Sequence, residues 1–141
     1  FFSTFLICCT KDSNSERSVR VNNPVVYFEI PVNDIDRAVI FYQKVFGYQF
    51  ERTSIDGNEM AIFPNDEDGL GISGALAKGD SYLPGKQGAR VYFNANNIDE
   101  ILSKAVAAGG KAAYPKTSID ELGWVAEFED CEGNIIALHS N

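Results

Sequence analysis

Val32-Asn33-Asp34-Ile35-Asp36 occurs a second time, in altered form, as Ala95-Asn96-Asn97-Ile98-Asp99. Each copy follows an apolar run typical of a strand and precedes an amphipathic helical pattern, so each marks a strand-to-helix junction. Gly47 and Gly110, which are expected to end the two helices, are separated by the same 63 residues (110 − 47, against 95 − 32). One junction and one helix end repeat at a single interval, and this predicts a duplicated structural unit.

Within each copy, the pattern of residues predicts one strand, then one helix, then three further strands. Asn33 or Asp34 is expected to cap the first helix and Asn97 the second, where Glu100 completes a capping-box pattern. The sequence therefore predicts an α+β fold in which two βαβββ modules form a half-open curved mixed sheet around a cavity. The expected modules are residues 24–78 and 88–140, within a single domain of residues 21–141.

Residues 1–20 have a different composition from this domain. A short apolar stretch that ends in Leu6-Ile7-Cys8-Cys9 is followed by a polar, Ser-rich tail. The stretch is interpreted as a signal remnant, with Cys9 as the lipid-bearing residue of an envelope lipoprotein, or as a linker or artefact of gene assembly. A cytoplasmic location is the favoured alternative to the lipoprotein.

Composition limits the classes of function. The net charge is −8 over 141 residues, and an acidic surface repels phosphate backbones and anionic lipid, so we expect no nucleic-acid partner. No apolar run approaches the roughly 20 residues needed to span a bilayer. The cysteines show no disulfide or CxxC pattern, and Cys131 lies between carboxylates, which do not activate a thiol.

Strand alternation separates an apolar face from a mixed polar face in each module. The apolar faces are expected to pack under the helices. If the polar faces of the two modules turn toward each other, their side chains line a ligand cavity; a plain solvated sheet face is the alternative. The side chains predicted to bind a ligand there are Tyr27, Glu59, Phe63, Arg90, Tyr92, Asn94 and Glu127, with Glu29 and His139 as catalytic candidates.

Two stretches carry a resemblance to a known superfamily. The first runs from Asn23-Pro24 through Asp36-Arg37-Ala38 to Val45-Phe46-Gly47, and the second from Ala107-Ala108-Gly109 to Asp130-Cys131-Glu132-Gly133-Asn134. Over residues 22–140 the chain resembles the vicinal-oxygen-chelate superfamily, which includes glyoxalase I, extradiol dioxygenases and bleomycin-resistance proteins. The nearest likeness is to short bacterial glyoxalase-related proteins. The resemblance implies a small-molecule ligand and a homodimer.

In the metal enzymes of that superfamily a divalent ion is bound from the first and last strands of both modules. The motifs align those four positions with Tyr27, about Gly74, Arg90 and Ala137. Gly74 and Ala137 bring no donor atom, and a guanidinium repels a divalent cation. No metal is therefore predicted at the usual position, although a shifted site using Glu29, Glu127 and His139 stays open.

Two functions remain open at this stage. The favoured one is a glyoxalase-like lyase or isomerase, in which Glu29 or His139 transfers a proton while Arg90 and Tyr27 hold the developing anion. The alternative is a non-catalytic protein that binds or sequesters a small molecule, as bleomycin-resistance proteins do. His139 is the only histidine, and a role in packing is the plain alternative to catalysis for it.

Overall fold

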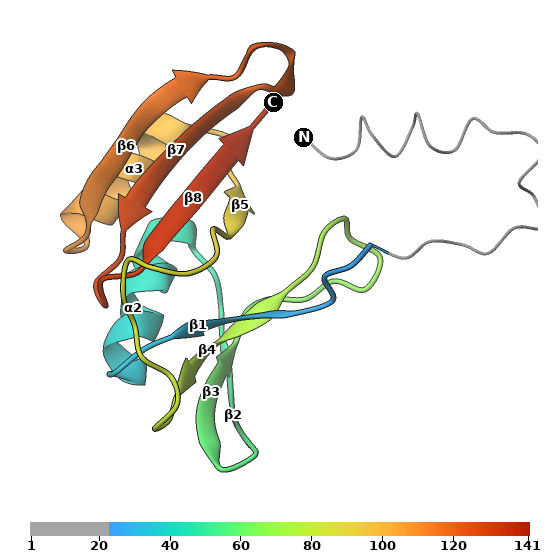
Figure 1. Ribbon diagram of the computed structural model, residues 1–141, viewed down its shortest axis with the longest axis vertical. Coiled ribbons are helices and arrows are strands. Elements are labelled where there is room, and N and C mark those ends of the chain that lie inside the picture. Colours follow the sequence, from blue (N-terminus) through green and yellow to red (C-terminus); the bar gives the residue numbers. More distant parts are fainter. Residues whose placement is uncertain (1–22) are drawn as a thin grey trace, which may run out of the picture.

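The two expected modules are present, and the predicted α+β architecture is confirmed (Figure 1). A computed structural model describes residues 23–141, so the interpretation of residues 1–20 lies outside the described residues. Module one consists of β1 (Phe28–Pro31), α2 (Ile35–Phe46), β2 (Glu51–Ile55), β3 (Asn58–Ile62) and β4 (Gly74–Lys78). Module two consists of β5 (Tyr92–Asn94), α3 (Ile98–Ala107), β6 (Lys111–Ser118), the short 3₁₀ helix η2 (Asp120–Leu122), β7 (Trp124–Glu129) and β8 (Ile135–Ser140).

Each module forms its own four-stranded mixed sheet with the same order of strands. The first, sheet A, has the order β1-β4-β3-β2, and the second, sheet B, has the order β5-β8-β7-β6. The first and last strands of each module pair in parallel and the remaining pairs are antiparallel. The duplication read from the sequence is therefore a duplication of topology.

Both helices begin where the repeated motifs place them, and α2 ends at Gly47 as expected, whereas α3 ends at Ala107 with Ala108 as its C-cap, before Gly110. The Asp34 side chain accepts a hydrogen bond from the Arg37 amide, and Asn97 accepts one from the Glu100 amide in the same way. These caps satisfy amide groups that have no partner inside the helix. Gly47 ends α2 with a φ of 77°, a conformation that glycine adopts without steric cost.

The main apolar core lies between the helices and the inner faces of both sheets. Helices α2 and α3 pack against each other, and an aromatic cluster joins the modules beneath them. Phe93 of β5 lies 5.8 Å from Phe28 and 5.6 Å from Phe63, measured between ring centroids. The prediction that the apolar strand faces pack under the helices is confirmed for β1, β5, β7 and β8 by this core.

The turn between β7 and β8 fastens module two to module one. Asp130 in this turn is 4% exposed and accepts hydrogen bonds from the Tyr42 hydroxyl at 2.6 Å and from the Glu132 and Asn134 amides. The Glu132 carboxylate accepts from the Asn33 and Asp34 amides just before α2 and forms an ion pair with Arg37. Residues nearly a hundred positions apart thereby hold the two modules together.

None of the helices in the described part of the chain has the length and apolar character required to cross a membrane.

Candidate functional site

Each sheet has one face turned away from α2 and α3, and we call these the helix-free faces. Strand register fixes their membership, because residues paired across a sheet lie on the same face. The helix-free face of sheet A carries Tyr27, Glu29, Met60, Ile62, Ala75 and Ala77. The helix-free face of sheet B carries Arg90, Tyr92, Asn94, Tyr114, Glu127, Ala137 and His139.

On sheet A, Glu29 of β1 lies at the centre of a small hydrogen-bonded group. Its two carboxylate oxygens accept separate hydrogen bonds, one from the Tyr27 hydroxyl at 3.0 Å and one from the Tyr82 hydroxyl at 2.6 Å. Burial, together with the hydrogen bond and negative charge of Glu29, raises the pKa of Tyr27 to about 12. The hydrogen bond to Glu29 likewise raises the pKa of Tyr82. Both phenols therefore act as neutral donors at physiological pH.

Tyr82 belongs to the connecting segment, residues 79–91, which links β4 to β5. Its ring packs against a small buried cluster on the helix-free face of sheet A, formed by Met60, Ala75 and Ala77. The connecting segment is tied to module two by Lys86, whose Nζ lies 3.6 Å from Glu129, and by Arg90. The segment thus joins the two helix-free faces.

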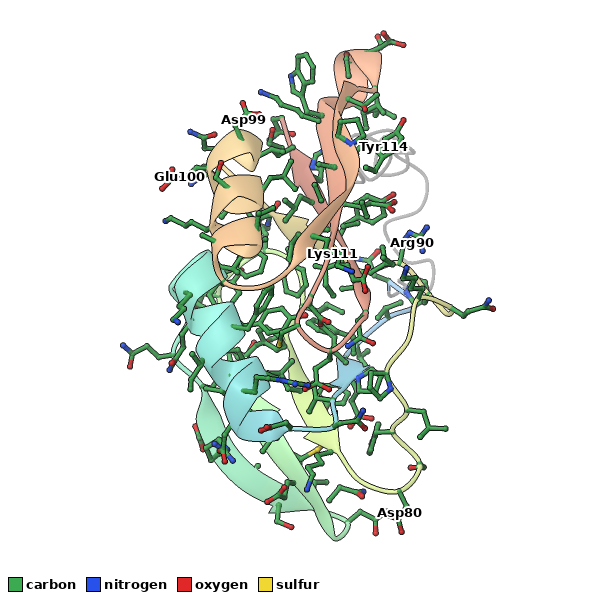
Figure 2. All side chains as sticks on the ribbon, turned by 90° about the vertical axis from the view of Figure 1, so that its left-hand side faces the viewer. Asp80, Arg90, Asp99, Glu100, Lys111 and Tyr114 are labelled. Carbon is green, nitrogen blue, oxygen red and sulfur yellow. The ribbon has the colours of Figure 1, made fainter. Side chains whose placement is uncertain are left out.

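On sheet B, four side chains form one row across the strands. Tyr92 pairs with Ala137, Ala137 with Glu127, and Glu127 with Tyr114. The Arg90 guanidinium donates to Glu127 at 3.1 Å and balances its charge. Figure 2 shows Arg90 and Tyr114 on the side of the molecule opposite to Asp99 and Glu100 of α3.

His139 lies on the same face of sheet B in the next row, paired with Asn94 of β5. Its ring is 8% exposed, and Nε2 lies 2.6 Å from the Leu122 carbonyl oxygen. Leu122 ends the 3₁₀ helix before β7, so the β6–β7 connection covers the ring. His139 and Glu29 lie on different sheets with different partners, and among the described residues no hydrogen bond joins them.

Two residues predicted for the polar face lie on the opposite face of sheet A. Phe63 is 4% exposed and belongs to the aromatic core, where it contacts Phe28. Glu59 alternates with the buried Met60 and is bound to Lys78 at 3.5 Å. The predicted side was wrong because β3 is apolar on both faces, with Ala61 and Phe63 toward the helices and Met60 and Ile62 away from them.

The donor atoms at the superfamily's metal positions do not fit a divalent ion. Burial and the hydrogen bond to Glu29 keep the Tyr27 phenol protonated by raising its pKa, and Arg90 places a permanent positive charge at another position. Ala137 has no donor atom, and neither Gly74 nor Ala75, the residues of β4 opposite Phe28 and Glu29, supplies one. Among the described residues no three His, Cys, Asp or Glu side chains are arranged to hold a metal ion, and Glu29, Glu127 and His139 are not brought together as the shifted site requires.

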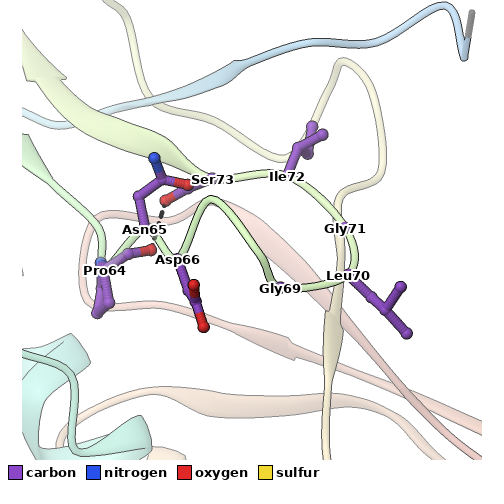
Figure 3. A pocket seen from close by; sticks show the side chains of 8 residues that line it. All are labelled: Pro64, Asn65, Asp66, Gly69, Leu70, Gly71, Ile72 and Ser73. Atoms are coloured by element: carbon purple, nitrogen blue, oxygen red, sulfur yellow. Dashed lines mark hydrogen bonds between the residues drawn. The ribbon is translucent and has the colours of Figure 1, made fainter.

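Two surface pockets lie away from the helix-free faces. One, of about 310 Å³, is formed within the β3–β4 loop by Pro64, Asn65, Asp66 and residues 69–73 (Figure 3). The other, of about 660 Å³, lies along α2 beside the residues that follow α3 and is lined by Arg37, Ile40, Lys44, Gly109 and Cys131 among others. Burial raises the pKa of the Cys131 thiol to about 11, which leaves it protonated and unreactive.

Comparison with known proteins places this geometry among related folds. The model of the bleomycin resistance protein-like N-terminal family matches residues 25–64. A glyoxylase-like domain-containing protein from Didymella fabae is 29% identical over 114 residues, which cover 78% of this chain and 88% of the relative.

Solved structures agree at the level of the fold. A mutant of glyoxalase I from Zea mays is 17% identical with a TM-score of 0.63, and the match covers 85% of this chain but only 48% of the maize chain. A mutant of the fosfomycin resistance protein FosX from Listeria monocytogenes, complexed with Mn(II) and dihydroxypropylphosphonic acid, is 17% identical with a TM-score of 0.62, over 86% of this chain and 94% of that chain. The resemblance to the vicinal-oxygen-chelate superfamily is confirmed by these matches.

Proposed function

We propose that this glyoxalase- and bleomycin-resistance-like chain of the vicinal-oxygen-chelate superfamily binds a small organic molecule on its helix-free faces, through side chains and without a metal at the usual position. The observation that carries the proposal is the set of residues at the four metal positions. A phenol, a guanidinium and two side chains without donor atoms can contact an organic molecule but do not coordinate a divalent ion.

Sequestration is the form of the proposal that the geometry favours. The catalytic candidates Glu29 and His139 lie on different sheets, and each already has a hydrogen-bond partner within the chain. General acid–base catalysis needs the proton-transferring group within reach of the substrate and its stabilising partners. The likeness of residues 25–64 to the bleomycin resistance protein-like N-terminal family also supports binding without catalysis.

A glyoxalase-like enzyme is the second candidate, and one observation favours it. Glu29 is half-buried and held in place by two phenols, as a positioned general base would be. In this version Glu29 takes a proton from the substrate, and the Tyr27 and Tyr82 hydroxyls donate to the oxygen where negative charge develops.

We propose a homodimer in which the helix-free faces are covered by a second copy. Tyr27 is 43% exposed and Tyr114 is 45% exposed, so each helix-free face presents aromatic surface. β1 and β5 are edge strands, which commonly need covering. Light scattering during size-exclusion chromatography tests this point, and a mass of one chain at micromolar concentration would remove it.

Titration calorimetry tests the proposed binding. Metal-free bleomycin, an organic cation, is expected to bind saturably to protein dialysed against a chelator, because net charge −8 favours cationic ligands. Fosfomycin, an anionic phosphonate, serves as the comparison. The expected result is bleomycin binding by protein that contains far less than one equivalent of divalent metal; binding that appears only after metal is restored would overturn the proposal.

A further inference from the structure

The partly or fully buried glutamates of the helix-free faces and the module junction differ in whether a cation is paired with them. Glu127 is paired with Arg90, Glu129 with Lys86, and Glu132 with Arg37. Glu29 is also partly buried, but it forms no ion pair within residues 23–141. A carboxylate partly removed from water is stabilised by a cation, and the described part of the chain does not supply one.

The partners that Glu29 does have leave its charge unbalanced. The Tyr27 and Tyr82 hydroxyls are neutral donors, and each occupies one acceptor position of a different carboxylate oxygen. Each oxygen keeps a second lone pair for another donor. Asp56 adds negative charge close to Tyr82 and strengthens the negative potential at this end of sheet A.

The surroundings of Glu29 suit an organic cation better than a metal ion. Two phenol rings adjoin the carboxylate, and the Tyr82 ring is held in place by packing against the buried residues Met60, Ala75 and Ala77. Aromatic faces attract ammonium groups and the carbon atoms attached to them. In the described chain no second and third acidic side chain join Glu29 to complete a metal site.

We infer that Glu29, Tyr27 and Tyr82 recognise an ammonium group of the ligand, with Glu29 as its counter-charge and Tyr82 as a positioning residue contributed by the connecting segment. This assignment rests on the proposed binding function and gives the ligand a chemical class: an organic amine.

Benzylamine tests the assignment, with benzyl alcohol and benzoate as neutral and anionic probes of similar shape. Titrations followed by amide chemical shifts are expected to show binding of benzylamine and at least about tenfold weaker binding of the other two, because a charge-assisted hydrogen bond is lost. Glu29→Gln keeps the shape of the side chain and should weaken benzylamine binding by about tenfold or more. Tyr82→Phe removes one hydroxyl and should weaken it less.

Glu59→Gln is the matched control, because it makes the same charge change on the opposite face of the same sheet, where Glu59 contacts Lys78. Benzylamine affinity should be unchanged in this variant. If Glu59→Gln weakened benzylamine binding as much as Glu29→Gln, the loss would reflect the net charge of the protein, and the proposed amine site would be wrong. If bleomycin binds the chain but Glu29→Gln leaves benzylamine and bleomycin affinity unaltered, the amine site is wrong and the proposed binding function stands. If no probe binds, both are wrong.

Discussion

The β3–β4 loop and the β7–β8 turn occupy equivalent places in the two modules and have diverged. Within the first connection Asp66 accepts a hydrogen bond from the Asp68 amide, and in the second Asp130, the first residue after β7, accepts one from the Glu132 amide. Asp66 is exposed in a loop whose Leu70 is 99% exposed, whereas Asp130 is buried against Tyr42 of the other module. The same local turn is exposed to solvent in module one, whereas in module two it is buried and joins the two modules by hydrogen bonds.

The helix-free faces show a corresponding divergence. The interval of 63 residues places Tyr27 and Glu29 of module one at the positions of Arg90 and Tyr92 in module two. The strands and helix N-caps are therefore alike in the two modules, while Arg90 stands in module two where module one has Tyr27, and Tyr92 stands where module one has Glu29. The two modules thus share strands and helix caps but differ in the side chains of their helix-free faces.

The largest expected effect concerns the two connections. Asp130→Ala removes the acceptor for Tyr42 and for two amides in a buried site, and we expect the free energy of unfolding to fall by about 3 kcal/mol. Asp66→Ala removes one exposed hydrogen bond and should change it by less than about 1 kcal/mol. Urea unfolding followed by far-UV circular dichroism measures both. Equal decreases in the free energy of unfolding in the two variants would show that the two connections contribute equally to stability, contrary to this prediction.

An intermediate effect concerns the ionisation of Tyr27 on the face of sheet A. The pKa of Tyr27 is raised to about 12, first by burial and then by Glu29, so Glu29→Gln should move it part of the way back toward 10. Because the raised pKa favours the neutral phenol in the folded state, its contribution to stability is complete below pH 10 and is lost as the pH rises through about 12.

Tyrosine absorbance at 295 nm, compared with that of Tyr27→Phe, isolates this ionisation. Tyr114 on sheet B has no carboxylate hydrogen bond in the described structure, and Tyr114→Phe provides the reference. A Tyr27 titration that is the same with and without Glu29 would mean that the carboxylate does not hold the phenol.

The smallest expected effect concerns the ion pair on sheet B. Arg90 and Glu127 are partly solvated, with side chains 44% and 21% exposed, and such pairs contribute about 0.5 kcal/mol. A double-mutant cycle of Arg90→Ala and Glu127→Ala, read from unfolding midpoints, measures the coupling. It should decline further at 1 M salt; a coupling of several kcal/mol would identify the pair as a structural anchor instead.

Sequence patterns predicted the fold well because they act locally. The helix caps Asp34 and Asn97 are determined by bonds within one turn, and the repeated interval needs no knowledge of packing. The faces of β1 and β5 were also predicted correctly, since Tyr27 and Glu29 alternate with apolar neighbours.

Other features of the candidate site could not be read in the same way. Glu59 and Phe63 were placed on the wrong face because apolar residues lie on both faces of β3. The alternation of residues therefore does not indicate which face packs under the helices. Tyr82 was missed because it lies in a connecting segment rich in glycine and proline, where no periodicity exists and only the tertiary fold brings it to Glu29. The central pocket expected between the modules is likewise a tertiary property, and the pockets observed lie elsewhere.

Mapping the amide chemical shifts of the ¹⁵N-labelled chain during a titration with metal-free bleomycin tests the location of binding most directly. Our account predicts that the largest changes occur at Tyr27, Glu29, Tyr82 and Arg90 and extend along β1 and β5. Changes confined to the β3–β4 loop, or to the pocket around Arg37 and Cys131, would contradict it, as would a spectrum that does not change at all.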